Sequence, residues 1–83
     1  MRILFAEDDK RLSKMIDFLL KKENYIVDCV YNGQDAIDYA NLSDYDIIIL
    51  DWMMPPPDGL AVCSKLRLEE TTRAIPVLML TAR

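Results

Sequence analysis

The chain has 83 residues, of which 52% are hydrophobic and 29% charged, and it contains only two glycines. This composition excludes a disordered or fibrous protein and allows one domain at most. The net charge of −4 disfavours direct nucleic-acid binding, and no apolar stretch approaches the ~18 residues of a membrane span, so we expect a cytoplasmic protein without nucleic-acid or membrane partners.

Histidine is absent, and the two cysteines, Cys29 and Cys63, lie far apart in the sequence. The absence of histidine excludes a histidine-based catalytic relay or a histidine-ligated metal within this chain. We expect the cysteines to be small buried residues in a reducing cytosol. Metal or phosphoryl chemistry must therefore rest on carboxylates and backbone groups.

The first strand is predicted at residues 2–6, a nearly continuous apolar run that is typical of a strand covered on both faces. A helix follows, because five apolar residues share one helical stripe: Leu12, Met15, Ile16, Leu19 and Leu20. Asp8 and Asp9 stand where helix-capping acids belong, and Lys21 and Lys22 where last-turn cations belong.

Residues 25–30 predict a second strand, in which Asp28 indicates a sheet edge, and the Asn32-Gly33 step after it is a turn signal. Residues 34–40 predict a short helix. The segment 46–50, with the sequence Asp-Ile-Ile-Ile-Leu, is the strongest strand candidate and is apolar on both faces, so it is expected at the centre of the sheet.

Residues 51–59 cannot be regular, because Pro55-Pro56-Pro57 removes three backbone donors. Asp58-Gly59 closes this loop and can cap a third helix, whose expected inner stripe is Leu60, Cys63 and Leu66. Residues 76–80 predict a fourth strand, which is followed by Thr81.

Strands that alternate with helices over short links predict an α/β fold with a parallel sheet. Ligands of such sheets bind beyond the carboxyl ends of the strands, where this chain places Glu7, Asp8, Asp51 and Thr81. Clustered carboxylates without histidine or cysteine favour Mg²⁺, and an aspartate beside Mg²⁺ can accept a phosphoryl group.

Each of these residues also has a simpler interpretation. Asp8 and Asp9 can cap the first helix, Asp51 can be a turn residue, Asp58-Gly59 can be a turn and cap, and Thr81 can be an ordinary strand residue. Their joint placement at the ends of three strands favours a shared site.

These residues resemble the receiver domain of two-component response regulators. The motifs are Glu7-Asp8 after the first strand, Asp51 followed by Met54-Pro55, the Asp58-Gly59 step, and Thr81-Ala82. The resemblance covers essentially the whole chain. It implies a flavodoxin-like sheet of order 2-1-3-4 and one incomplete receiver domain over residues 1–83, without the fifth strand, the last two helices and the effector domain.

The resemblance also implies a signalling role rather than an enzyme. Asp51 would accept a phosphoryl group from a sensor histidine kinase, while Asp8, Asp51 and the Met53 backbone carbonyl would ligate Mg²⁺. Glu7 would hold a metal-bound water, Thr81 would hydrogen-bond the phosphoryl group, and Asp9 would only start a helix. The residues flanking Asp51 and the chain end resemble transcriptional regulators with a winged-helix domain.

One departure from the family pattern is the missing phosphate-binding lysine of the fifth strand, so we expect phosphorylation of this chain to be impaired. The apolar segment 75–80 would be an exposed edge, which favours a strand-paired or domain-swapped homodimer.

Three alternative functions remain open. One is a receiver-like self-association module that is not phosphorylated. Another is an aspartate-nucleophile phosphohydrolase, which would need an acid where Met53 stands. The third is a nucleotide-binding domain, which would need a glycine-rich loop.

Overall fold

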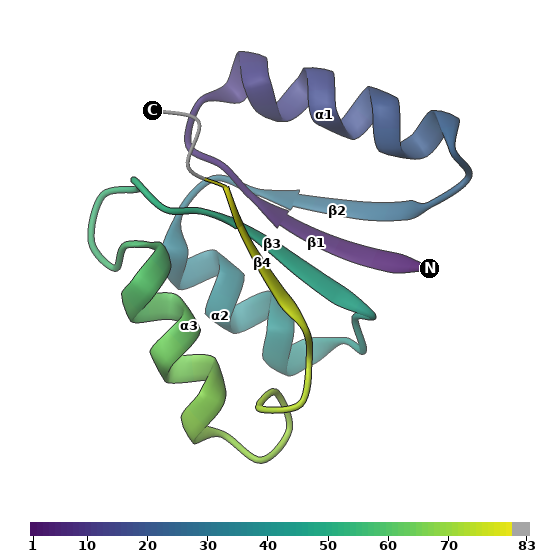
Figure 1. Ribbon diagram of the computed structural model, residues 1–83. Helices are drawn as coiled ribbons and strands as arrows, with labels where there is room; N and C mark the ends of the chain where they lie inside the picture. Colours follow the sequence, from purple (N-terminus) through teal and green to yellow (C-terminus); the bar gives the residue numbers. More distant parts are fainter. Residues whose placement is uncertain (81–83) are drawn as a thin grey trace.

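The computed structural model describes residues 1–80, which form a four-stranded parallel sheet. The spatial order is β2-β1-β3-β4, which is the flavodoxin-like order predicted from the sequence (Figure 1). The strand boundaries differ from the predicted ones by one residue at most. The strands are β1 (Arg2–Ala6), β2 (Ile26–Val30), β3 (Ile47–Asp51) and β4 (Val77–Leu80).

The helices cover the sheet unequally. α1 (Lys10–Lys22) lies on one face, whereas α2 (Gly33–Leu42) and α3 (Gly59–Leu68) lie side by side on the other (Figure 1). In the part of the chain described here, no helix is long and apolar enough to cross a membrane.

The central strands are buried on both faces, as the apolar runs predicted. Leu4 and Ile48 belong to the core beneath α2 and α3. Phe5 and Ile49 belong to a smaller core on the α1 side. This alternation follows from the two-residue period of a strand, which sends successive side chains to opposite faces.

The predicted inner stripe of the first helix is wrong in part. Met15 and Leu19 are about half exposed, while Ser13 is buried beside the partly buried Ile16 and Leu20. The reason is that α1 packs against β1 and β2, so only part of its apolar surface finds a partner.

Two smaller expectations also need correction. In α3 the buried side chains are Val62 and Leu66, whereas Leu60 is exposed. The cysteines are not fully buried: both are half-buried free thiols, with Cys63 packed against the larger core and Cys29 against the smaller one.

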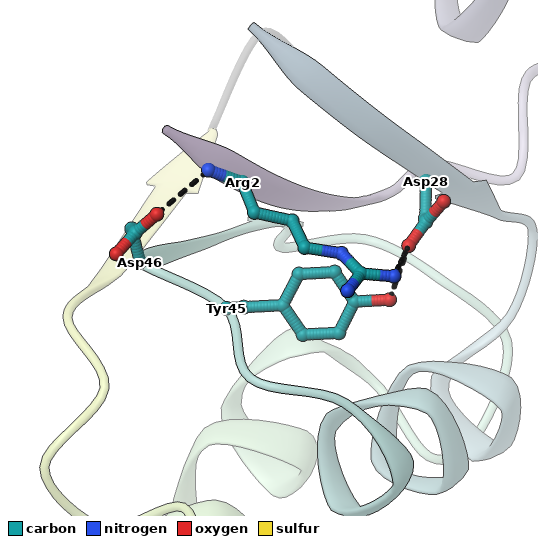
Figure 2. A network of polar contacts seen from close by, with 4 residues as sticks. All are labelled: Arg2, Asp28, Tyr45 and Asp46. Atoms are coloured by element: carbon teal, nitrogen blue, oxygen red, sulfur yellow. Dashed lines mark hydrogen bonds and ion pairs between the residues drawn. The ribbon is translucent and has the colours of Figure 1, made fainter.

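The amino ends of β1 and β3 are linked to β2 by a polar network (Figure 2). The Tyr45 hydroxyl donates to Asp28 Oδ2 over 2.6 Å, and Arg2 Nη2 donates to the same oxygen over 3.3 Å. The Arg2 backbone N–H donates to Asp46 Oδ2 over 2.7 Å. These contacts link three strands near the amino end of the sheet, opposite the carboxyl end where the acidic site was predicted.

Candidate functional site

Three carboxylates meet at the carboxyl ends of β1 and β3. Glu7 and Asp8 follow β1 directly, and Asp51 is the last residue of β3. Because β1 and β3 are paired neighbours with Ala6 opposite Leu50, the residues that follow emerge at the same level. One carboxylate oxygen from each of the three acids lies within 4.8 Å of the others. The structure thus brings together three of the predicted site residues.

Two of these acids are almost completely buried, Glu7 at 2% exposure and Asp51 at 3%, whereas Asp8 is half-buried. Burial, together with the neighbouring Asp8 and Asp51, raises the pKa of Glu7 to about 7. The backbone N–H of Asp9 donates to Glu7 Oε2 over 2.9 Å and opposes this rise. The site therefore concentrates negative charge that a bound cation would stabilise.

Asp9 has a different role from Asp8, as predicted. Its Oδ1 accepts hydrogen bonds from the backbone N–H groups of Arg11 and Leu12, at 3.0 and 3.3 Å, so it is the N-cap of α1. Asp8 instead contributes an oxygen to the carboxylate cluster. Helix capping explains only the second member of the acidic pair.

The loop after β3 orients Asp51. The Met53 N–H donates to Asp51 Oδ1 over 3.2 Å, which limits rotation of the carboxylate. Asp58 caps α3 by accepting from the Ala61 N–H over 2.9 Å, so this aspartate serves as the predicted cap. The predicted role of the Met53 carbonyl as a metal ligand stays a prediction.

Two glycines position this loop, and their role was not predicted. A Cβ at Gly59 would lie 2.6 Å from the Asp51 carbonyl oxygen, and a Cβ at Gly33 would lie 2.1 Å from the Pro57 carbonyl oxygen. The two helix starts can therefore approach the loop only because no side chain intervenes. The sequence did offer one signal for this role. The chain has only two glycines, and each is the first residue of a helix.

Thr81 lies outside the described residues, so its predicted contact with a phosphoryl group stays a prediction. β4, whose last residue is Leu80, pairs with β3 so that Leu80 lies opposite Asp51.

The donor set of the cluster fits Mg²⁺. It consists of carboxylate oxygens, which are hard ligands, and neither a thiolate nor an imidazole belongs to it. Glu7, Asp8 and Asp51 are close enough for one small cation to touch them directly or through water.

Comparison with known proteins identifies the family. Residues 3–83 match the model of the response regulator receiver domain. Response regulator ArlR of Staphylococcus aureus (strain Mu50) is 42% identical over 82 residues, which are 99% of this chain and 36% of that protein. The chain thus spans about a third of the curated relatives that it matches.

Solved receiver structures share the fold. The N-terminal domain of a response regulator receiver protein from Methanoculleus marisnigri matches with a TM-score of 0.94 and 30% identity, over 99% of this chain and 67% of that one. A receiver domain of a sensor histidine kinase from Pseudomonas aeruginosa, with a magnesium ion coordinated in its active-site cleft, matches with 0.94 and 32% over the same shares. The fold, the family match and these likenesses agree, and the chain therefore belongs to the response regulator receiver domain family.

Proposed function

We propose that this chain is a phosphoacceptor module in which Asp51 takes a phosphoryl group from a phosphohistidine of a sensor histidine kinase. The observation that carries the proposal is the clustering of three carboxylate oxygens within 4.8 Å around a buried strand-end aspartate. An Asp51 oxygen would form the new P–O bond as the P–N bond of the donor breaks, and the imidazole would leave with the electron pair.

Asp8 and Asp51 would ligate Mg²⁺ directly, joined by the Met53 carbonyl, and Glu7 would hold a water bound to the ion. The bound ion supplies charge neutralisation for the transferring phosphoryl oxygens. The magnesium described in the cleft of the Pseudomonas receiver domain supports this assignment. Asp51 is held by the Met53 N–H, so its carboxylate is oriented before the donor arrives. Thr81 would hydrogen-bond the transferred group.

The role of the longer protein is also part of the proposal. By analogy with the response regulators that it resembles, phosphorylation would control transcription through an effector domain in a cytoplasmic protein. The chain spans 36% of the response regulator ArlR.

The test is labelling with acetyl phosphate in the presence of Mg²⁺. We expect a phosphorylated species in the unchanged chain, none in Asp51→Asn, and normal labelling in the matched control Asp44→Asn, an exposed acid outside the cluster. Labelling that survives in Asp51→Asn would place the acceptor elsewhere.

We further propose that the 83-residue chain is phosphorylated slowly. The five lysines of the sequence lie in α1 and α3, and two of them are engaged away from the cluster. Lys10 lies over the Tyr31 ring at 5.0 Å, and Lys21 pairs with Asp17 at 3.1 Å. These contacts keep Lys10 and Lys21 from acting as cationic partners of a transferred phosphoryl group.

A second candidate function is self-association without phosphoryl transfer. It is favoured by β4, an apolar strand that forms an edge of the described sheet and leaves Leu78 half exposed. A strand-paired or domain-swapped homodimer would cover this edge. Unchanged self-association in Asp51→Ala, together with no labelling of the unchanged chain, would favour this function over phosphoryl transfer.

A further inference from the structure

A groove of about 440 Å³ lies between α1 and the outer edge of β2, outside the carboxylate cluster. One wall is formed by lysines on one side of α1, and the other by β2 and the residue that follows it. The lining includes Lys10, Lys14, Lys21, Val27, Cys29 and Tyr31.

The backbone of β2 offers hydrogen-bonding groups to this groove. β2 is an edge of the described sheet and pairs only with β1. The Ile26 N–H donates to the Met1 carbonyl, and the Val30 carbonyl accepts from Glu7, so these alternate residues face β1. The N–H and C=O groups of Val27 and Cys29 therefore point to the outer edge, where a further strand can pair with them.

The groove is basic although the chain as a whole is acidic. Three lysines line it against one acid, Asp17, whereas the whole chain carries a net charge of −4. Asp17 pairs with Lys21 over 3.1 Å, so Lys10 and Lys14 provide the excess positive charge. Burial raises the pKa of the Cys29 thiol, which keeps the groove floor free of an opposing negative charge.

Ser13 adds a polar group at the base of the groove. It is 1% exposed, and it lies beside the Cys29 thiol, with which its hydroxyl interacts.

We propose that this groove is a docking site for an acidic, extended segment of a partner protein, which adds to the outer edge of β2. Lys10 and Lys14 are one helical turn apart, a rise of about 6 Å along α1. Side chains on one face of a strand repeat every ~6.6 Å. A segment with acids at alternate positions therefore sets one carboxylate against each lysine while its backbone pairs with Val27 and Cys29.

The binding test uses a fluorescein-labelled peptide, Thr-Glu-Val-Glu-Val-Glu-Thr, and fluorescence anisotropy at physiological salt. We expect saturable binding that weakens about tenfold in the double variant Lys10→Glu/Lys14→Glu. The matched control Arg11→Glu/Lys22→Glu makes the same charge change at exposed α1 positions outside the groove lining, and binding should change about twofold at most. Equal losses in both double variants, or no binding to the unchanged chain, would overturn the proposal.

Amide hydrogen exchange distinguishes strand addition from adsorption by charge. Peptide binding should protect the Val27 and Cys29 amides, because these face the open edge of β2. Bound peptide without this protection would overturn the proposal even if the lysines were required. Asp51→Asn should leave peptide binding unchanged, so the result is independent of the proposed phosphoryl transfer.

Discussion

The burial of Glu7 disfavours the charged form of its carboxyl group. Its pKa rises from 4.5 to about 7 because the side chain is desolvated beside Asp8 and Asp51. Between these two pH values the folded state binds more protons at Glu7 than the unfolded state does. The contribution of Glu7 to the free energy of unfolding therefore falls as the pH rises from 4.5 to 7.

The variant Glu7→Gln cannot lose a proton at this position, so its stability relative to the unchanged chain should increase with pH. We expect the difference in unfolding free energy to grow by about 3 kcal/mol between pH 4.5 and 7.5 without metal. Urea unfolding across this pH range measures it. Excess Mg²⁺ should shrink the difference, and a difference independent of pH would contradict the account.

The separate roles of Asp8 and Asp9 could be predicted from the sequence. The helix start explains Asp9, and the resemblance to receiver domains assigned Asp8 to the cluster. The near-complete burial of Glu7 was not predictable, because it depends on how chain segments distant in sequence close over the strand ends.

Among the elements, the first residue of α2 packs against the loop that follows Asp51. Gly33 begins α2 and lies against the Pro57 carbonyl oxygen, six residues beyond Asp51. The Asn32-Gly33 step was predicted as a turn from its residue types, but a close approach between segments far apart in the chain leaves no local sequence pattern. By contrast, β3 was predicted as a central strand because its apolar character on both faces is local information.

Gly33→Ala tests this contact. Gly33 has no positive φ, so alanine suits the helix and would by itself stabilise it by about 0.5–1 kcal/mol. The clash at 2.1 Å should reverse the sign and give a net destabilisation of about 1–3 kcal/mol. Urea unfolding is the measurement, with the exposed α2 change Gln34→Ala as the control. A variant as stable as the unchanged chain would show that the loop moves freely.

For the whole molecule, the sheet has two edges of different character. The β2 edge lies beside the lysines of α1, whereas the β4 edge is apolar and carries no charge. The α1 face also leaves Phe18 two-thirds exposed. Alternating strands and helices predicted the parallel sheet, but its strand order was predictable only from the resemblance to receiver domains. The partial cover by α1 was not predictable, since the helical stripe does not tell how far the helix extends across the sheet.

Leu78→Lys tests association through the β4 edge. Leu78 is 49% exposed, so a lysine there should be tolerated by the fold. It should oppose strand pairing between two copies, because a charge on an edge strand disfavours pairing. Sedimentation velocity at high protein concentration should show a dimer for the unchanged chain and a monomer for the variant. A variant that remains dimeric would place the interface elsewhere.

The carboxyl ends of β1 and β3 are proposed to form one Mg²⁺ site around Asp51. Trp52, the single tryptophan, follows Asp51 directly and is 42% exposed, so its fluorescence should report metal binding. A Mg²⁺ titration should give a saturable signal that weakens about tenfold or more in Asp8→Asn and is unchanged in Asp44→Asn. If Asp8→Asn bound Mg²⁺ as tightly as the unchanged chain, the clustered carboxylates would not form the proposed site.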